Sequence, residues 1–227
     1  LLFIFDMDDV LYDYDWRIRM EGLTELTGLD FAELRRRWWH EDGDVLEPGA
    51  VVAEVFGPAR AVLSAERTLL NLLCHLSGVA TLTAAYVAEC VPVMVLDTRK
   101  TTPGLRALEK YAVRCGGGAN KRMGLYDVAM VKDNHVVAAG SVAAAVRAVQ
   151  ERFPDVAVQV EADTLEQAME ALDAGARFLL LDNMAPATLR EVVAAVRARE
   201  PQTGPVELEA TGNLTLDVAA EVAGTGV

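Results

Sequence analysis

The sequence lacks several features that mark common classes of protein. Its three cysteines show no C-x-x-C spacing, which argues against a zinc site or a disulfide framework and fits a reducing, cytoplasmic compartment. The longest apolar runs are far shorter than the roughly 18 residues that a membrane span needs. No basic region precedes the apolar opening LLFIF, so we do not expect it to be a signal peptide. No Gly-x-Gly-x-x-Gly opens a helix, which argues against a Rossmann sheet.

Positive charge is also scarce. The 227 residues include 21 Lys and Arg against 34 Asp and Glu, a net charge of −13 that argues against nucleic-acid or anionic-membrane binding. The exception is residues 99–132, where eight basic residues stand against two acidic ones. A basic stretch in an acidic chain is typical of a local anion site. The hydrophobic content of 52% fits a soluble globular protein with one large or two small domains.

From Pro92 onward, apolar runs alternate with helical patterns. The runs predicted as buried strands are Val93–Leu96, Val128–Val131, Val156–Val160, Phe178–Leu181 and Val206–Leu208. The helical patterns that follow them are Pro103–Cys115, Ser141–Phe153, Thr164–Ala174, Pro186–Arg199 and Thr215–Val222. Ser141, Thr164 and Thr215 are the expected N-caps, and Gly116-Gly117-Gly118 ends the first helix. Near-continuous apolar strands alternating with helices predict parallel βα units and a β/α barrel.

Each predicted strand ends in a polar or charged residue, where a purely structural sequence would place apolar residues or plain turn formers. These residues are Asp97 with Arg99 and Lys100, then Lys132, Glu161, Asp182 and Glu209. In a β/α barrel the carboxyl ends of the strands converge on one face, which carries the active site. We therefore expect these side chains to form one site.

The residue types at these ends indicate the chemistry of the site. The basic residues Arg99, Lys100, Arg122 and Lys132 suit a polyanion such as carboxylates or a pyrophosphate. The acids Glu161 and Asp182 suit sugar hydroxyls or Mg²⁺, which prefers oxygen ligands. Thr211-Gly212-Asn213 stands just before a helix N-terminus, where hydroxyl and backbone N–H donors commonly bind phosphate.

The first forty residues carry a different pattern. The run LLFIF leads into Asp6-Met7-Asp8-Asp9-Val10, which resembles the first motif of haloacid-dehalogenase-like hydrolases, with Asp6 as nucleophile and Asp8 as general acid/base. A strand followed by an acidic helix-capping turn explains the same residues without catalysis. Two helices are expected, around Tyr14–Leu26 and Phe31–Trp39, before a seam at residues 41–44.

A strand and a long helix are expected between this seam and Pro92. The strand is predicted at Val51–Phe56, and the helix begins at Ser64 as N-cap and runs to about Cys90, with a bend at Gly78. Arg67 falls in its expected first turn, where a cation opposes the helix dipole and favours a polar partner. His75 is expected to be a packed or surface residue.

Several long motifs occur in an order that resembles the quinolinate phosphoribosyltransferase family (nicotinate-nucleotide pyrophosphorylase, carboxylating). They cover about residues 41–227 and read SAERTLLNLLCHLSGVAT, DTRKTTPGLRALEKYAV, GGGANKRMGLYD, KDNH, EAD, LLLDN and EATGN. KDNH favours this family over its molybdenum-transport-associated relatives. The resemblance implies a type II phosphoribosyltransferase-like α/β fold, here an incomplete β/α barrel preceded by a short α/β segment.

The resemblance also implies a reaction and the residues that serve it. Quinolinate and phosphoribosyl pyrophosphate would give nicotinate mononucleotide, pyrophosphate and CO₂, a pentosyl transfer in NAD biosynthesis that needs no side-chain nucleophile. The implied quinolinate-binding residues are Arg67, Arg99, Arg122 and Lys132, with Lys121 where the family commonly has His. Lys100 would contact phosphoribosyl pyrophosphate, Glu161 and Asp182 the ribose hydroxyls with Mg²⁺, and Thr211 and Gly212, beside Asn213, the 5′-phosphate. Lys100, Glu161 and Asp182 are thus the expected catalytic residues.

The family resemblance predicts three segments and a dimer. These are a hydrolase-like fragment over 1–40, a remnant of the family's N-terminal sandwich with its linking helix over 41–91, and a catalytic barrel over 92–227 that ends before its closing strand. The family's dimers borrow the residue corresponding to Arg67 from the neighbouring subunit, so a cytoplasmic homodimer with a shared site is expected. Two alternatives stay open: an inactive fragment that still binds anions, and a Mg²⁺-dependent phosphatase using Asp6 and Asp8.

Overall fold

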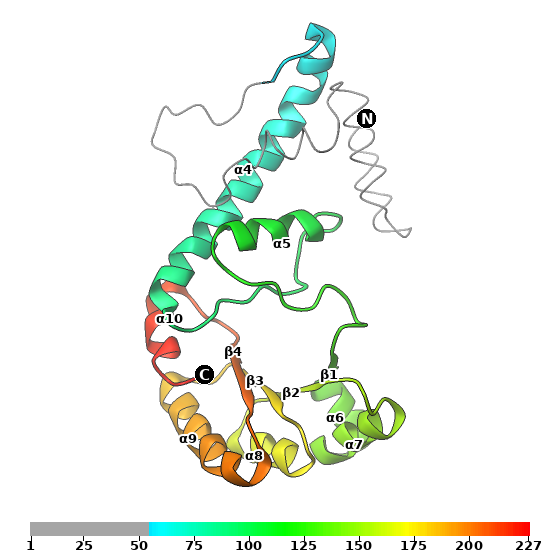
Figure 1. The fold of residues 1–227 in the computed structure, drawn as a ribbon, viewed down its shortest axis with the longest axis vertical. Coiled ribbons are helices and arrows are strands. Elements are labelled where there is room, and N and C mark those ends of the chain that lie inside the picture. Colours follow the sequence, from blue (N-terminus) through cyan, green and yellow to red (C-terminus); the bar gives the residue numbers. More distant parts are fainter. Residues whose placement is uncertain (1–54) are drawn as a thin grey trace. The chain divides into compact units, whose positions relative to one another are not determined.

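A computed structural model describes residues 55–227, which belong to two compact units (Figure 1). The helical unit comprises residues 55–84 and Leu96–Asn120, and the sheet unit comprises Ala85–Val95 and Lys121–Val227. The hydrolase-like motif with Asp6 and Asp8, the two helices expected around it, and most of the strand expected at Val51–Phe56 lie outside the described residues. Val55 and Phe56, which are described, are not in a strand.

Helix α4 (Ala59–Cys90) contributes residues to both units. Its first turn forms at Pro58, whose carbonyl oxygen accepts hydrogen bonds from the amides of Ala61 (2.9 Å) and Val62 (3.1 Å). The predicted start at Ser64 is therefore wrong: Ser64 lies inside the helix and its hydroxyl donates to the carbonyl of Arg60 at 2.7 Å. Arg67 consequently lies beyond the first turn, and the dipole argument made for it does not apply.

The length and composition of α4 also satisfy the criteria for a membrane span, which no other helix within residues 55–227 does. Helices that pack in the cores of soluble proteins meet the same criteria.

Helix α5 (Arg106–Cys115) forms the second element of the helical unit. It begins later than expected, because Pro103 and Gly104 form a turn in which Gly104 has a φ of 77°. At its other end Gly116 is the C-cap, as predicted. A Cβ atom on Gly116 would lie 2.3 Å from the carbonyl oxygen of Ala80 in α4. Glycine is thus required there for the two helices to approach closely.

The prediction of a strand at Val93–Leu96 is wrong, because this run forms no strand within residues 55–227. Only Leu96 makes a β-bridge, an isolated parallel one with Ala119, and Met94 is 67% exposed. The run therefore has neither a continuous hydrogen-bonded partner nor the burial on both faces that its apolar sequence indicated.

The sheet unit is built from parallel βα repeats. Its strands are β1 (Ala129–Val131), β2 (Val158–Ala162), β3 (Phe178–Asp182) and β4 (Glu207–Thr211), hydrogen-bonded in the order β1-β2-β3-β4. Its helices are α6 (Asp133–Ala139), α7 (Val142–Arg152), α8 (Leu165–Asp173), α9 (Pro186–Thr203) and α10 (Leu216–Ala223). Sequential parallel order is the order of neighbouring strands in a β/α barrel. The α/β class predicted from the sequence is confirmed.

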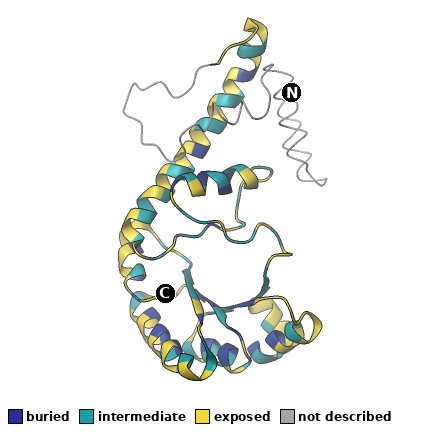
Figure 2. Cartoon of the chain, in the orientation of Figure 1, coloured by how far each residue is buried: buried dark blue, intermediate teal, exposed yellow. Residues whose placement is uncertain are grey.

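Side-chain alternation divides this sheet into two faces. Val160, Leu179 and Leu181 are fully buried in a core with α7, α8 and α9, which lie along one face of the sheet (Figures 1 and 2). Because successive side chains point to opposite faces, the neighbouring strand residues occupy the other one, which we call the inner face. The inner-face residues are Met130, Gln159, Glu161, Phe178, Leu180, Asp182, Glu207, Glu209 and Thr211.

All three residues predicted as N-caps of the repeats occupy that position, and two of them make a side-chain capping bond. Ser141 accepts from the amide of Ala144 at 3.0 Å, and Thr164 from that of Gln167 at 3.2 Å. Thr215 is the N-cap residue of α10, as predicted, but its side chain makes no capping hydrogen bond. Helix α6 was not predicted from the sequence, because its DNHVVAA is too short to show a helical period.

Candidate active site

Lys132 and Glu161 form an ion pair at the carboxyl ends of β1 and β2. The distance from Lys132 Nζ to Glu161 Oε2 is 2.5 Å, and the Glu161 side chain is 14% exposed. His135, in the first turn of α6, fixes the backbone of Lys132: its Nδ1 accepts from the Lys132 amide at 3.0 Å, and its own amide donates to the Lys132 carbonyl at 2.8 Å. The ion pair therefore joins the ends of β1 and β2, and His135 holds the backbone of Lys132 in place.

Lys121 and Glu209 form a second, more deeply buried pair on the same face. Lys121 Nζ lies 2.8 Å from Glu209 Oε1 and 2.6 Å from Oε2, and both side chains are less than a fifth exposed. The ammonium group also lies 5.7 Å from the centre of the Phe178 ring. Gln159, which is fully buried, donates from Nε2 to Glu209 Oε2 at 3.0 Å. Glu209 is thus held from two sides on the inner face.

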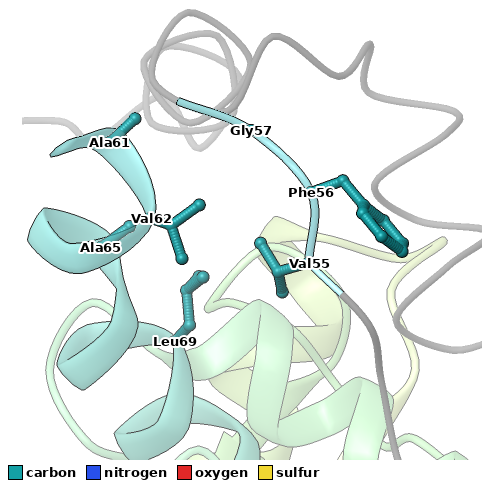
Figure 3. A pocket seen from close by; sticks show the side chains of 7 residues that line it. All are labelled: Val55, Phe56, Gly57, Ala61, Val62, Ala65 and Leu69. Atoms are coloured by element: carbon teal, nitrogen blue, oxygen red, sulfur yellow. The ribbon is translucent and has the colours of Figure 1, made fainter. Parts of the chain in front are cut away.

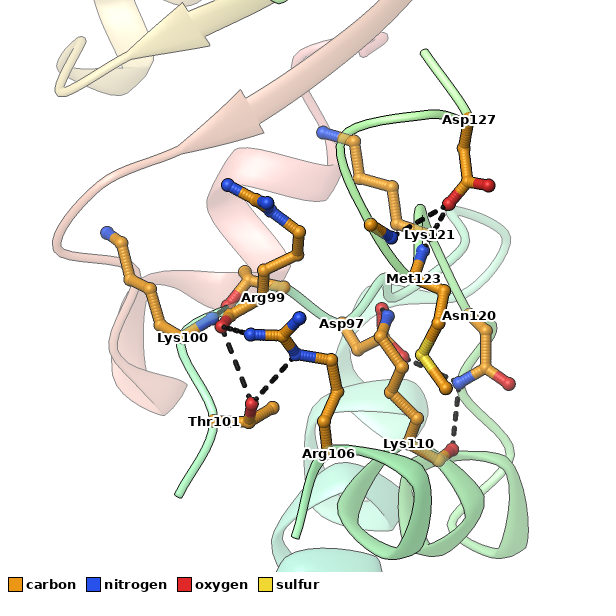
Figure 4. Close-up of polar contacts among 12 residues, drawn as sticks. Asp97, Arg99, Lys100, Thr101, Arg106, Lys110, Asn120, Lys121, Met123 and Asp127 are labelled. Atoms are coloured by element: carbon orange, nitrogen blue, oxygen red, sulfur yellow. Dashed lines mark hydrogen bonds and ion pairs between the residues drawn. The ribbon is translucent and has the colours of Figure 1, made fainter. Parts of the chain in front are cut away.

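Arg122 lies in the loop that precedes β1. Its Nη1 donates to the carbonyl of Val128 at 3.4 Å, and its Nη2 lies 3.1 Å from the sulfur of Met130. The loop itself is closed by Asp127, whose carboxylate accepts from the amides of Met123 and Gly124 (Figure 4). Arg122 is half-buried, and these contacts place its guanidinium beside the start and middle of β1.

The ends of β3 and β4 are joined by asparagines. The Asn183 amide donates to the carbonyl of Thr211 at 2.9 Å, and Asn213 Nδ2 donates to Asn183 Oδ1 at 2.8 Å. Asn183 also donates to Asp182 Oδ2 at 2.7 Å. Asn183 and Asn213 both have φ near +50°, an uncommon backbone conformation that tends to occur at functional sites. Gly212, with φ +85°, passes so close that a Cβ atom would lie 2.3 Å from Asn183 Oδ1.

Carboxylates gather around these strand ends. Burial raises the pKa of Asp163, and the negative charges of Asp182, Glu161 and Asp133 raise it further. The four carboxyl groups come from the ends of β2 and β3 and from the start of α6. Asp133, Asp163 and Asp182 therefore add negative charge beside the Lys132–Glu161 pair.

The helical unit carries the other basic candidates. Arg99 and Lys100 lie in the loop between Asp97 and α5 (Figure 4), with Arg99 half-buried and Lys100 exposed. Among the described residues Arg99 Nε is buried without a hydrogen-bond partner. Arg67 is exposed on α4 and has no ion pair within residues 55–227. That these three residues meet those of the sheet unit stays a prediction.

A pocket beside the first turns of α4 offers no alternative site for an anion. Its lining has no charged or hydrogen-bonding side chain (Figure 3); it consists of Val55, Phe56, Gly57, Ala61, Val62, Ala65 and Leu69.

The structure brings together Lys121, Lys132, Glu161 and Glu209 in pairs, and Asp182 with the Thr211–Asn213 turn. Sequence reasoning missed Gln159 and Asn183. A polar residue inside the run VAVQVEA, two positions before Glu161, should have indicated that Gln159 shares its face. Asn183 follows Asp182 directly, but nothing in the sequence indicated its contact with Asn213.

Comparison with known families matches most of the chain. Residues 79–227 match the model of the quinolinate phosphoribosyl transferase C-terminal domain, and residues 21–77 that of the N-terminal domain. The second match overlaps residues 1–40, whose resemblance to hydrolases finds no support in the comparisons. Nor do they support the phosphatase or the inactive fragment.

Individual relatives agree with the family matches. A nicotinate-nucleotide pyrophosphorylase [carboxylating] of Mycobacterium leprae is 47% identical, covering 90% of this chain and 71% of the relative. A probable enzyme of that name from Bacillus subtilis is 46% identical over 82% of this chain and 64% of the relative. The solved nicotinate-nucleotide pyrophosphorylase of Francisella tularensis is 38% identical with a TM-score of 0.75, covering 84% of this chain and 66% of that chain. This chain therefore spans about two thirds of their length.

Proposed function

The chain belongs to the quinolinate phosphoribosyltransferase family, and we propose that it joins quinolinate to phosphoribosyl pyrophosphate. The pyridine nitrogen attacks the anomeric carbon of the ribose, and the bond from that carbon to pyrophosphate breaks. The carboxylate next to the positively charged nitrogen then leaves as CO₂, and its electron pair stays on the ring carbon, which is protonated. The products are nicotinate mononucleotide, pyrophosphate and CO₂.

The observation that carries this proposal is the pairing of two lysines with two glutamates on the inner face. Lys132 with Glu161 and Lys121 with Glu209 keep the site charge-balanced, which offsets the large cost of burying lone charges. A substrate with two adjacent carboxylates matches these cations. When it binds, its carboxylates replace glutamate at Lys132, and Glu161 turns to the ribose hydroxyls.

The carboxylates at the strand ends suit the transition state. Positive charge develops on the ribose as pyrophosphate departs, and fixed negative charges nearby stabilise it without reorganisation. Asp182, held by Asn183, and Glu161 would supply these charges. The pKa of Asp163 is raised first by burial and then by the negative charges of Asp182, Glu161 and Asp133, which is consistent with carboxylates gathered at these strand ends.

The turn after β4 would bind the 5′-phosphate of the ribose. Thr211 offers a hydroxyl, and Gly212 and Asn213 offer backbone amides ahead of α10, where a helix N-terminus favours an anion. The left-handed conformation of Gly212 and the bond from Asn213 to Asn183 keep this turn in one shape.

Mg²⁺ fits this site only with help from the substrate. Within the part of the chain that the structure describes, no three His, Cys, Asp or Glu residues form a metal-binding group, and Glu161 is engaged with Lys132. Mg²⁺ is commonly held by one or two carboxylates together with phosphate oxygens and water, and Asp182 and Glu161 would be those carboxylates. When bound, the ion neutralises negative charge on the departing pyrophosphate.

The basic residues of the helical unit complete the proposal. Lys100 would contact phosphoribosyl pyrophosphate, and Arg99, with Arg122 from the sheet unit, would contact quinolinate. Arg67, exposed on α4, would reach the site of a neighbouring subunit in a homodimer. We propose a cytoplasmic location for the enzyme; a relative in Arabidopsis thaliana is named chloroplastic.

Product analysis tests the proposal directly. The purified chain, given quinolinate, phosphoribosyl pyrophosphate and Mg²⁺, should release nicotinate mononucleotide and one CO₂ per turnover, and chelation of Mg²⁺ should stop it. Glu161→Gln should lower the rate by roughly 100-fold or more, as expected for loss of a group that stabilises transition-state charge. Glu191→Gln, the same change at an exposed position of α9, is the matched control. A wild-type chain that forms no product would refute the proposal.

A further inference from the structure

Three charged residues of the helical unit are buried and have no part in the proposed reaction. Asp97 and Glu109 are each 9% exposed and Lys110 is 4% exposed. Charged side chains are almost never buried unless they are paired, because removing them from water is costly. All three lie around the loop that carries Arg99 and Lys100. The hydrogen-bond partners of each residue show which part of this loop it fixes.

Lys110 holds the beginning of this loop. Its Nζ donates to Asp97 Oδ1, and Asn120 Nδ2 donates to Asp97 Oδ2 at 2.6 Å (Figure 4). Asn120 donates also to the carbonyl of Lys110 at 2.8 Å. The Asp97 amide donates to the carbonyl of Ala119 at 3.1 Å. The residue two positions before Arg99 is thus fixed through both its side chain and its backbone.

Glu109, the neighbour of Lys110 in α5, holds the far part of the loop. Its Oε2 accepts from the amide of Thr102 at 3.1 Å, and its Oε1 accepts from Nε2 of His75 at 2.7 Å. His75 comes from α4, so a single carboxylate joins α4 and α5 to the loop. Burial raises the pKa of Glu109, but the hydrogen bonds from Thr102 and His75 outweigh burial and hold the pKa below its ordinary value.

Arg106 adds a third attachment in the middle. Its Nε donates to Thr101 Oγ1 at 3.1 Å and its Nη2 to the carbonyl of Arg99 at 3.3 Å (Figure 4). Residues on either side of Lys100 are therefore tied to the first turn of α5. A segment with an exposed lysine and a Pro-Gly turn would otherwise have many conformations open to it.

We propose that His75 and Glu109 are positioning residues that hold the loop of residues 98–105 so that Arg99 and Lys100 are presented to substrate in one geometry. The expected effect on catalysis rests on the proposed function. The attachment of the loop by His75 and Glu109 does not depend on that function. Neither residue would touch substrate. Misplacing a binding group by about 1 Å can lower a rate about 100-fold, so such positioning matters for kcat/KM.

Hydrogen exchange and kinetics on the full chain test this inference together. Glu109→Gln keeps the size of the side chain and removes its charge. Since a hydrogen bond to a charged group is worth about a tenfold change in equilibrium or more, amides of residues 98–105 should exchange about 10-fold faster while those of β3 do not change. KM for phosphoribosyl pyrophosphate should rise about 10-fold, with kcat changed less than 3-fold.

A second variant and a control complete the test. His75→Ala removes a side chain that is 42% exposed, so the chain should tolerate it, and it should reproduce the faster loop exchange in part. Glu191→Gln should change neither exchange nor KM. Equal loop exchange in Glu109→Gln and wild type would overturn the inference, as would an unchanged KM with a lowered melting temperature. Failure of the wild-type chain to form product would instead refute the proposed function, and the exchange measurement would still decide the attachment of the loop.

Discussion

The two units hold their candidate site residues in different ways. In the sheet unit, Glu161, Asp182 and Glu209 lie on strands whose backbone hydrogen bonds fix both their direction and their register. In the helical unit, Arg99 and Lys100 lie in a loop that side chains from two helices hold at separate points. The first arrangement depends on a regular backbone and a packed core, and the second on individual buried charges.

This difference predicts which substitutions should affect each unit most. A ladder of parallel strands distributes its support over many bonds, so a single polar substitution at a strand end removes chemistry and leaves the scaffold intact. A loop held by a few charged contacts loses its shape when one contact is removed. Core substitutions should therefore affect the sheet unit most, and substitutions of buried charges or close-packed glycines the helical unit.

The largest expected effect is on the core of the sheet unit. Leu181→Ala removes a fully buried side chain from β3 and should lower the free energy of unfolding by about 2–5 kcal/mol. Leu63→Ala, at a position 72% exposed on α4, should change it by less than about 0.5 kcal/mol. Urea unfolding followed by circular dichroism measures both. Equal losses in the two variants would contradict the burial that separates them.

The next effect is on activity. Lys132→Met removes the cation that is proposed to bind a carboxylate of the substrate. A hydrogen bond to a charged group is worth about 1.5–3 kcal/mol, so product formation should fall roughly 100-fold. Arg190→Met breaks an exposed pair with Glu221, which is worth about 0–1 kcal/mol, and activity should stay within twofold. Steady-state kinetics of the folded variants would show whether the Lys132–Glu161 pair matters more for activity than the exposed Arg190–Glu221 pair.

A smaller effect is expected where α5 meets α4. Gly116→Ala would bring a methyl group within 2.3 Å of the Ala80 carbonyl oxygen, and such overpacking costs about 1–3 kcal/mol. Gly78→Ala, inside α4 with no atom within 4 Å, should instead stabilise by about 0.5–1 kcal/mol. Thermal unfolding of both variants checks the opposite signs, and two shifts of the same sign would argue against this packing.

The smallest effect is a pH dependence in the helical unit. The pKa of Glu109 is lower in the folded chain than its ordinary value, so its stabilisation is present above the unfolded pKa of about 4.3 and lost as pH falls through the folded pKa. The difference in unfolding free energy between wild type and Glu109→Gln should therefore shrink from pH 7 to about pH 3. Glu191→Gln should show no such trend. A difference that grows on acidification would exclude this role for Glu109.

Much of the sheet unit was predictable because its signals are local. Phe178–Leu181 and Val128–Val131 were recognised as strands from runs of apolar residues, and the polar residues beside them were placed on one face. The same signal was wrong for Val93–Leu96, since an apolar run becomes a strand only when a neighbouring strand pairs with it. Within residues 55–227 only Leu96 of this run makes a β-bridge.

The sequence by itself determined the family, the parallel βα repeats and the positions of Lys132, Glu161 and Asp182 at or next to strand ends. Glu209, which was also expected at a strand end, lies in the middle of β4. Motifs, the periodicity of apolar residues and residue types can all be read directly from the linear sequence. Only the tertiary structure decided which charged and polar side chains pair with each other. Lys121 meets Glu209 across 88 positions, and His75 meets Glu109 across 34. Buried charges find partners wherever the backbone brings opposite groups within bonding distance, and no local pattern encodes that distance.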